Sequence, residues 1–144
     1  MTEAWAPSLT EVGSRCPTKT RDQTAQPGTD GLLGTFNDKT VPTDVMAQPL
    51  VTGAIAVVAD AVGTIGAALY DLAKDAAAWR AAADIELAYP QRDGDIKIYE
   101  QLDRRAKLAL DRLIAAADDS GSGTDATLPQ WAFPTPVSWG DENL

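Results

Sequence analysis

The sequence predicts an all-α protein: a small bundle of three to four helices, with a long β-hairpin-like excursion and an extended C-terminal arm. Two observations support this prediction. In residues 43–117, which are rich in alanine, apolar residues recur at steps of three and four, the spacing of a helix face. Residues 1–42 and 118–144 lack that spacing. At 144 residues the chain is one domain by length, with an N-terminal helix and excursion (1–42), a helical core (43–117), and a linker and docking arm (118–144).

The clearest helix is predicted at residues 95–117. Its apolar stripe repeats with helical spacing and consists of Tyr99, Leu102, Ala106, Ala109, Leu113 and Ala116. The other face is charged, and Glu100 and Asp103 each precede a basic residue, Arg104 and Lys107, by four positions. Such pairs add modest helix stability.

A second helix is predicted at residues 44–62, with Thr43 as its N-cap. Pro49 should kink this helix or mark its true first turn, and Gly63 and Gly66 should loosen or end it. Its predicted apolar stripe is Val51, Ile55, Val58, Val62 and Ile65.

A third helix is predicted at residues 67–89 and is ended by Pro90. One face is expected to consist of Leu69, Leu72, Ala76, Trp79, Ala83 and Leu87. Asp95, after a polar turn, is expected to cap the next helix. The acidic residues around this turn match no calcium-loop spacing, so we interpret them as capping and surface charge.

The N-terminal region contains a capping box, Ser8-x-x-Glu11, which predicts a short helix at residues 9–15; a loose arm is the alternative. Residues 17–42 show no helical pattern. Strand candidates at 18–21 and 33–36 flank turn residues, so we predict a long, irregular β-hairpin or excursion. A loop of this length is usually functional or disordered, and both alternatives stay open. Leu33 and Phe36 are its candidate partner contacts.

The C-terminal segment changes composition sharply after Ala117. Residues 118–124 predict a flexible linker, and residues 128–139 are rich in proline and aromatic side chains. Exposed aromatic residues favour association, so Trp131, Phe133 and Trp139 are predicted anchors for a partner. The alternative is that this segment packs back on its own helices.

Charge and composition exclude several classes of function. The net charge of −9 disfavours binding to nucleic-acid phosphate. The chain has no histidine, and its one cysteine, Cys16, has no histidine to activate it. We therefore expect no enzyme activity, no catalytic residues, no cofactor and no metal site. The N-terminus does not have the pattern of a signal peptide, which predicts a cytosolic product.

Residues 50–72 raise an alternative, a small membrane-active protein. Only Asp60 and Asp71 are charged in this run, which is long enough to span a bilayer. Alanine and glycine are weakly apolar, however, and Asp60 would lie near the centre at a cost of about 3 kcal/mol. A buried helix of a soluble core is the preferred interpretation.

Five short motifs occur in a familiar order: EVGSR at 11–15, KT at 19–20, GTFNDKTVPT at 34–43, AAADIELAYP at 81–90 and YEQL at 99–102. In order and spacing, residues 11–113 resemble the head-to-tail adaptor proteins of long-tailed bacteriophages, also called head completion or connector proteins. Pro49 and the Gly63/Gly66 pair depart from the expected regular helix, and the proline-aromatic arm does not map onto the family.

The resemblance implies a structural virion protein that forms a homo-oligomeric ring beneath the portal protein and extends the DNA channel. Its other partner would be a tail-proximal neck protein, a stopper or tail terminator. DNA would pass through without specific binding, and an acidic wall would let the duplex slide. The implied location is the neck of the virion, after assembly in the host cytoplasm, and no membrane is involved.

Overall fold

The computed structural model describes residues 3–121, and within them the protein is all-α, as predicted. The order of elements is α1 (Leu9–Gly13), the 3-10 helix η1 (Pro17–Thr20), α2 (Asp44–Val62), the 3-10 helix η2 (Ala67–Leu69), α3 (Tyr70–Ala88) and α4 (Asp95–Gly121). The three long helices carry the fold, and the shorter elements pack against them.

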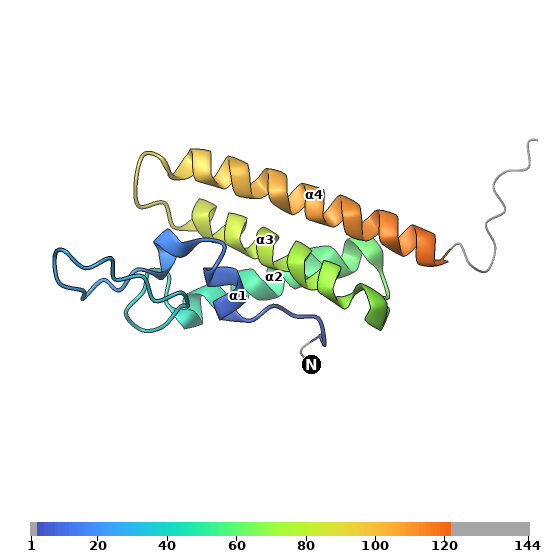
Figure 1. The fold of residues 1–144 in the computed structure, drawn as a ribbon, viewed down its shortest axis with the longest axis horizontal. Coiled ribbons are helices and arrows are strands. Elements are labelled where there is room, and N and C mark those ends of the chain that lie inside the picture. Colours follow the sequence, from blue (N-terminus) through green and yellow to red (C-terminus); the bar gives the residue numbers. More distant parts are fainter. Residues whose placement is uncertain (1–2, 122–144) are drawn as a thin grey trace, which may run out of the picture.

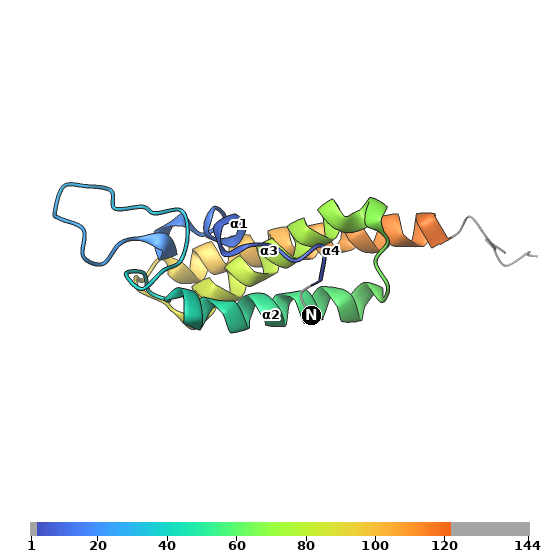
Figure 2. The same ribbon diagram turned by 90° about the horizontal axis from the view of Figure 1, so that it is seen from below.

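Helix α3 lies at the centre of the bundle. It runs antiparallel to both α2 and α4, which flank it on different sides (Figures 1 and 2). Helices α2 and α4 contact α3 extensively and each other only slightly, and α1 packs on α2 and α3. The excursion at residues 21–42 and the α3–α4 turn lie at one end of the bundle (Figure 1). The α2–α3 connection lies near the other end.

The central position of α3 follows from its small side chains. Alanine lets neighbouring backbones approach closely from several directions and is the best helix former. The buried residues of α3 are Ala73, Ala76, Ala77, Ala78, Ala81, Ala82, Ala83, Ile85 and Glu86. Leu87, predicted on the apolar face, is instead 57% exposed, because the buried surface follows the alanines around the helix.

The predicted starts of the helices are largely confirmed. Ser8 and Glu11 form the capping box of α1, and the Thr43 hydroxyl accepts a hydrogen bond from the Met46 amide at the start of α2. Gly63 ends α2 with a φ of +80°, a conformation that favours glycine. Helix α4 continues four residues beyond the predicted end at Ala117. No helix-breaking residue occurs before Gly121, so residues 118–121 of the predicted linker are helical.

The predicted β-hairpin is wrong for the part of the chain that the structure describes. One antiparallel bridge, between Arg21 and Leu32, is all that forms of it, and the first strand candidate overlaps η1. Pro17 favours the start of a helical turn. Asp22 turns the chain away from extended pairing by accepting hydrogen bonds from both the amide and the hydroxyl of Thr24.

Arginines tie the elements together at the surface of the bundle. Arg15, after α1, pairs with Asp75 of α3 at 2.7 Å, and Arg80 of α3 pairs with Asp103 of α4 at 3.2 Å. Trp79 is half-buried between two guanidinium groups, those of Arg15 and Arg105, each 5.0 Å from the ring centroid. Trp79, predicted on the apolar face of the third helix, therefore packs between the segment after α1 and helix α4.

Candidate functional site

A buried ion cluster joins three segments that are far apart in the sequence. Lys19 of η1 is 1% exposed, and its ammonium group lies 2.7 Å from Asp95 at the start of α4 and 3.3 Å from Glu86 near the end of α3. Both carboxylates are also buried. Because an unpaired buried charge is very costly, this cluster fixes η1 against the α3–α4 turn.

Asp95 organises the turn before α4 rather than the helix start that we predicted for it. Its carboxylate accepts hydrogen bonds from the Gln91 and Arg92 amides. Hydrogen bonds from Lys19 and these amides lower the pKa of Asp95 to about 2. The Gln91 side chain donates to the Val41 carbonyl at 3.1 Å, so the same turn also holds the end of the excursion.

The carboxylate of Glu86 accepts fewer hydrogen bonds than that of Asp95. Its Oε1 accepts a hydrogen bond from the Thr18 hydroxyl at 3.1 Å. Its Oε2 is within ion-pair distance of Lys19 but has no hydrogen bond of good geometry. We take this contact as a charge attraction without a directional bond. Burial raises the pKa of Glu86, and the nearby ammonium group opposes that rise.

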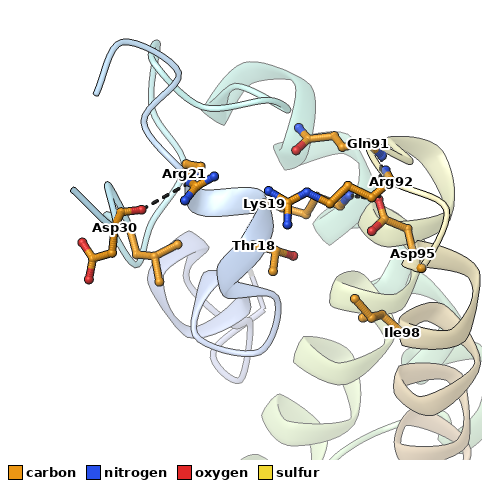
Figure 3. Close-up of a pocket in the computed structure, with 10 residues that line it drawn as sticks. Thr18, Lys19, Arg21, Asp30, Gln91, Arg92, Asp95 and Ile98 are labelled. Carbon is orange, nitrogen blue, oxygen red and sulfur yellow. Dashed lines mark hydrogen bonds and ion pairs between the residues drawn. The ribbon is translucent and has the colours of Figure 1, made fainter. Parts of the chain in front are cut away.

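A half-open pocket of about 340 Å³ lies beside this cluster, between η1, the excursion and the α3–α4 turn (Figure 3). Its lining residues are Thr18, Lys19, Arg21, Asp30, Leu32, Gln91, Arg92, Gly94, Asp95 and Ile98. Lys19 and Asp95 are paired with each other, and the Arg21 guanidinium donates to the Asp30 carbonyl (Figure 3). These contacts hold the base of the excursion and engage the charged groups of Lys19, Asp95 and Arg21.

The chemical groups near the cluster are poorly suited to covalent chemistry. Cys16 is buried, and burial, with the Glu86 charge, raises its thiol pKa to about 12. A thiol in that state is a weak nucleophile. Within residues 3–121, no group of three acidic or cysteine side chains is arranged to hold a metal ion.

The outer face of α2 is exposed and almost uncharged. It carries Val45, which is 77% exposed, and Met46, followed along the helix by Pro49, Gly53, Ala56 and Asp60. The whole helix contains no basic residue. Helix α2 is also long and apolar enough to cross a membrane, yet only 22% of that apolar window is buried in the fold. Exposed apolar side chains gathered on one helix face are a candidate interaction surface.

The outer face of α4 has the opposite character. Its exposed stripe contains Lys97, Gln101, Arg104, Leu108 and Arg112, and Leu108 is 57% exposed. Exposed acidic residues share this face: Glu100, Asp111, Asp118 and Asp119. The outer face of α4 therefore carries charges of both signs, with bases between residues 97 and 112 and two acids near its C-terminal end.

The predicted interface residues fall in three places. Leu33 is 41% exposed on the excursion and is available to a partner. Phe36 is 3% exposed and packs in the core with Val12, where it holds the excursion to the bundle; its interface role stays a prediction. The anchors Trp131, Phe133 and Trp139 lie outside the described residues.

Sequence reasoning did not find the buried cluster. Lys19 lies 67 and 76 positions before its partners, and a lone lysine carries no local sign of burial. The two helix faces are partly visible in the sequence: the run at 50–72 has few charges, and the periodicity of residues 95–117 separates a charged face from an apolar one. No family model, no curated protein and no solved structure matches this chain.

Proposed function

We propose that this protein is a structural subunit that assembles into a ring, acting as a head-to-tail adaptor beneath the portal of a long-tailed bacteriophage. The proposal joins the resemblance of residues 11–113 to that family with the surfaces of the fold. One observation supports it most: a small bundle exposes two extended and different helix faces, on α2 and on α4, on different sides of α3.

A ring needs two complementary surfaces that do not coincide on the subunit. Helices α2 and α4 meet that need, whereas the excursion and the α3–α4 turn are at one end of the bundle (Figure 1). In the proposed assembly, the helices contact neighbouring copies. The excursion, through Leu33, and the arm at 128–144 reach the portal and the next tail-proximal protein. The acidic remainder of the surface borders the DNA channel and does not bind the duplex.

The experiment is the native mass of the purified chain, alone and mixed with the portal protein encoded with it. A ring-sized species in either sample is the expected result. A monomer in both samples would overturn the proposal.

Deleting residues 128–144 tests the role of the arm. We expect assembly with the portal or the tail-proximal protein to weaken, while the free energy of unfolding changes by less than about 0.5 kcal/mol, as for a surface change. Chemical denaturation measures the second quantity. An equal loss of assembly and of stability would place the arm in the fold instead.

The exposed apolar length of α2 also supports a second candidate, a membrane-active protein. In the fold, the predicted run at 50–72 is divided by the turn after Gly63, so α2 alone would enter the bilayer. Fractionation of the expressed chain distinguishes the two candidates. Recovery in the aqueous fraction without detergent supports the adaptor, and recovery only with detergent supports the membrane protein.

A further inference from the structure

We infer that the half-open pocket beside the buried ion cluster binds a small organic oxyanion, a carboxylate or a phosphate monoester carried on an apolar group. Arg21 and Arg92 hold the oxyanion, and Leu32 and Ile98 contact the apolar group. This inference goes beyond the proposed ring function and does not depend on it, because one copy of the chain supplies every residue that lines the pocket.

Two arginines reach this pocket from segments that are far apart in the sequence. Arg21 directly follows η1, and Arg92 lies in the α3–α4 turn. The Arg92 side chain extends from the turn toward η1 (Figure 3). Within residues 3–121 neither guanidinium group forms an ion pair, whereas Arg15 and Arg80 are each paired with an aspartate. Guanidinium groups match the geometry of carboxylate and phosphate, so two of them in one pocket favour an anion.

The acids that line the pocket do not neutralise these arginines. Asp95 is engaged by Lys19 and by the amides of the turn. The Asp30 carbonyl accepts a hydrogen bond from Arg21 Nε at 3.3 Å, but the Asp30 carboxylate points away from that guanidinium group (Figure 3). The lining therefore contains three bases and two acids. In the described part of the chain, the terminal nitrogens of Arg21 and the guanidinium group of Arg92 face no carboxylate partner.

Three further acids lie near the pocket without lining it. Glu86 is buried against Lys19, Asp22 accepts hydrogen bonds from Thr24, and Asp93 is exposed in the α3–α4 turn. Their charges oppose the approach of any anion. We therefore expect the affinity to come from direct hydrogen bonds to guanidinium groups and from apolar contact, and not from long-range attraction.

The walls of the pocket are fixed without a ligand. Arg21 and Leu32 form the antiparallel bridge at the base of the excursion, and the Leu33 amide donates to the Thr20 carbonyl at 3.0 Å. The buried ion cluster joins this wall to the α3–α4 turn. Binding to a preformed site loses less conformational entropy than binding to a site that must first become ordered.

The apolar part of the lining indicates the second half of the ligand. Leu32 is 48% exposed, and Ile98 lines the same pocket. The volume of about 340 Å³ lies within the range of small-molecule sites, which combine apolar walls with a few polar groups that fix orientation. An inorganic anion would leave this apolar wall without contacts, so an oxyanion on an apolar group fits better.

Calorimetric and amide NMR titrations of the full chain at low salt test the site. The probes are phenyl phosphate, benzoate, inorganic phosphate and the neutral benzyl alcohol. We expect an aromatic anion to bind, inorganic phosphate to bind more weakly, and benzyl alcohol not to bind. The amide shifts should gather at Leu32, Gln91 and Gly94, which surround the pocket.

Substitutions at exposed positions separate the two parts of the site without disturbing the core. Arg21→Gln and Arg92→Gln should each weaken binding of the aromatic anion about tenfold, because each removes charge-assisted hydrogen bonds. Arg112→Gln, at an exposed arginine farther along α4, is the matched control and should leave the affinity unchanged. Leu32→Ser should weaken binding of the aromatic anion but not of inorganic phosphate.

The opposite results would overturn the site. These are no binding of either aromatic anion at about 10 mM, an equal loss of affinity in Arg112→Gln and Arg92→Gln, or amide shifts confined to another part of the bundle. Failure here is distinguishable from failure of the proposed function. A ring-sized species that binds no anion overturns only this site, whereas a monomer that binds one overturns only the adaptor assembly.

Discussion

Different interactions stabilise the two ends of the bundle. At the end that carries the excursion, Lys19, Glu86 and Asp95 form a buried ion cluster inside a partly polar core. Toward the other end, the core consists of apolar residues, among them Trp5 and Leu113. Long helices pack well through apolar contact alone. The excursion has no strands, so few backbone hydrogen bonds fix it to the bundle. Directional charge contacts provide the attachment that strand pairing would otherwise give.

The largest expected effect is at the charged end. Replacing Lys19 with Met keeps the volume but leaves two buried carboxylates without their cation, so the free energy of unfolding should fall by about 3–5 kcal/mol. Urea denaturation measures it. Lys39→Met, at an exposed lysine of the excursion, is the matched control and should cost less than about 0.5 kcal/mol. Equal losses in the free energy of unfolding for the two variants would contradict the interpretation that the ion cluster anchors the excursion.

At the apolar end, Leu113→Ala should destabilise by about 2–4 kcal/mol, because Leu113 is fully buried and its truncation leaves a cavity. Leu108→Ala, at an exposed position on the same helix, is the control and should change stability little. The loss at Leu113 should be the same at pH 7 and at pH 4, since no titrating group is involved. A strongly pH-dependent loss would contradict the comparison of the two ends.

The charged end should also make the stability of the fold sensitive to acid. The folded pKa of Asp95 is about 2 against an ordinary 3.8, so the unfolded state binds more protons in acid. Its contribution, about 2 kcal/mol, is complete above pH 4 and is lost as the pH falls through 2. Asp95→Asn should therefore lose less stability than the natural chain between pH 5 and pH 2.

Chemical denaturation across that range measures the difference. Glu86, whose pKa is raised mainly by burial and also by the Asp95 charge, acts in the opposite direction in both proteins, and less in Asp95→Asn because that charge is gone. Parallel curves for the two proteins would exclude the Asp95 contribution.

The smallest expected changes in stability are those at two glycines. A Cβ at Gly13 of α1 would lie 2.8 Å from the Gly34 carbonyl oxygen of the excursion, so Gly13→Ala should cost about 1–3 kcal/mol. Gly53→Ala on α2 enters open space within a helix and should stabilise by roughly 0.5–1 kcal/mol. Thermal unfolding of both variants checks the signs. A stabilising Gly13→Ala would mean that α1 and the excursion are not closely packed.

The helices could be predicted because their signals are local. Thr43 and Gly63 mark the two ends of α2, and the spacing of Leu102, Ala106 and Leu113 identifies the buried stripe of α4. The β-hairpin prediction for the excursion was wrong because a short strand and a 3-10 turn can have similar local sequences. Only their contacts with distant segments distinguish them. Whether the 18–21 segment pairs as a strand or coils into η1 depends on the contacts that Lys19 makes elsewhere.

By itself, the sequence determined the all-α class, the positions of the long helices and the acidic, histidine-free character of the protein. These follow from periodicity, caps and composition, which act over one or two helical turns. Only the tertiary structure decided that α3 is central, that Lys19 is buried with Glu86 and Asp95, and that the faces of α2 and α4 remain open. Those features depend on which side chains meet across distant segments, and a buried charge becomes stable only when the fold delivers its partner.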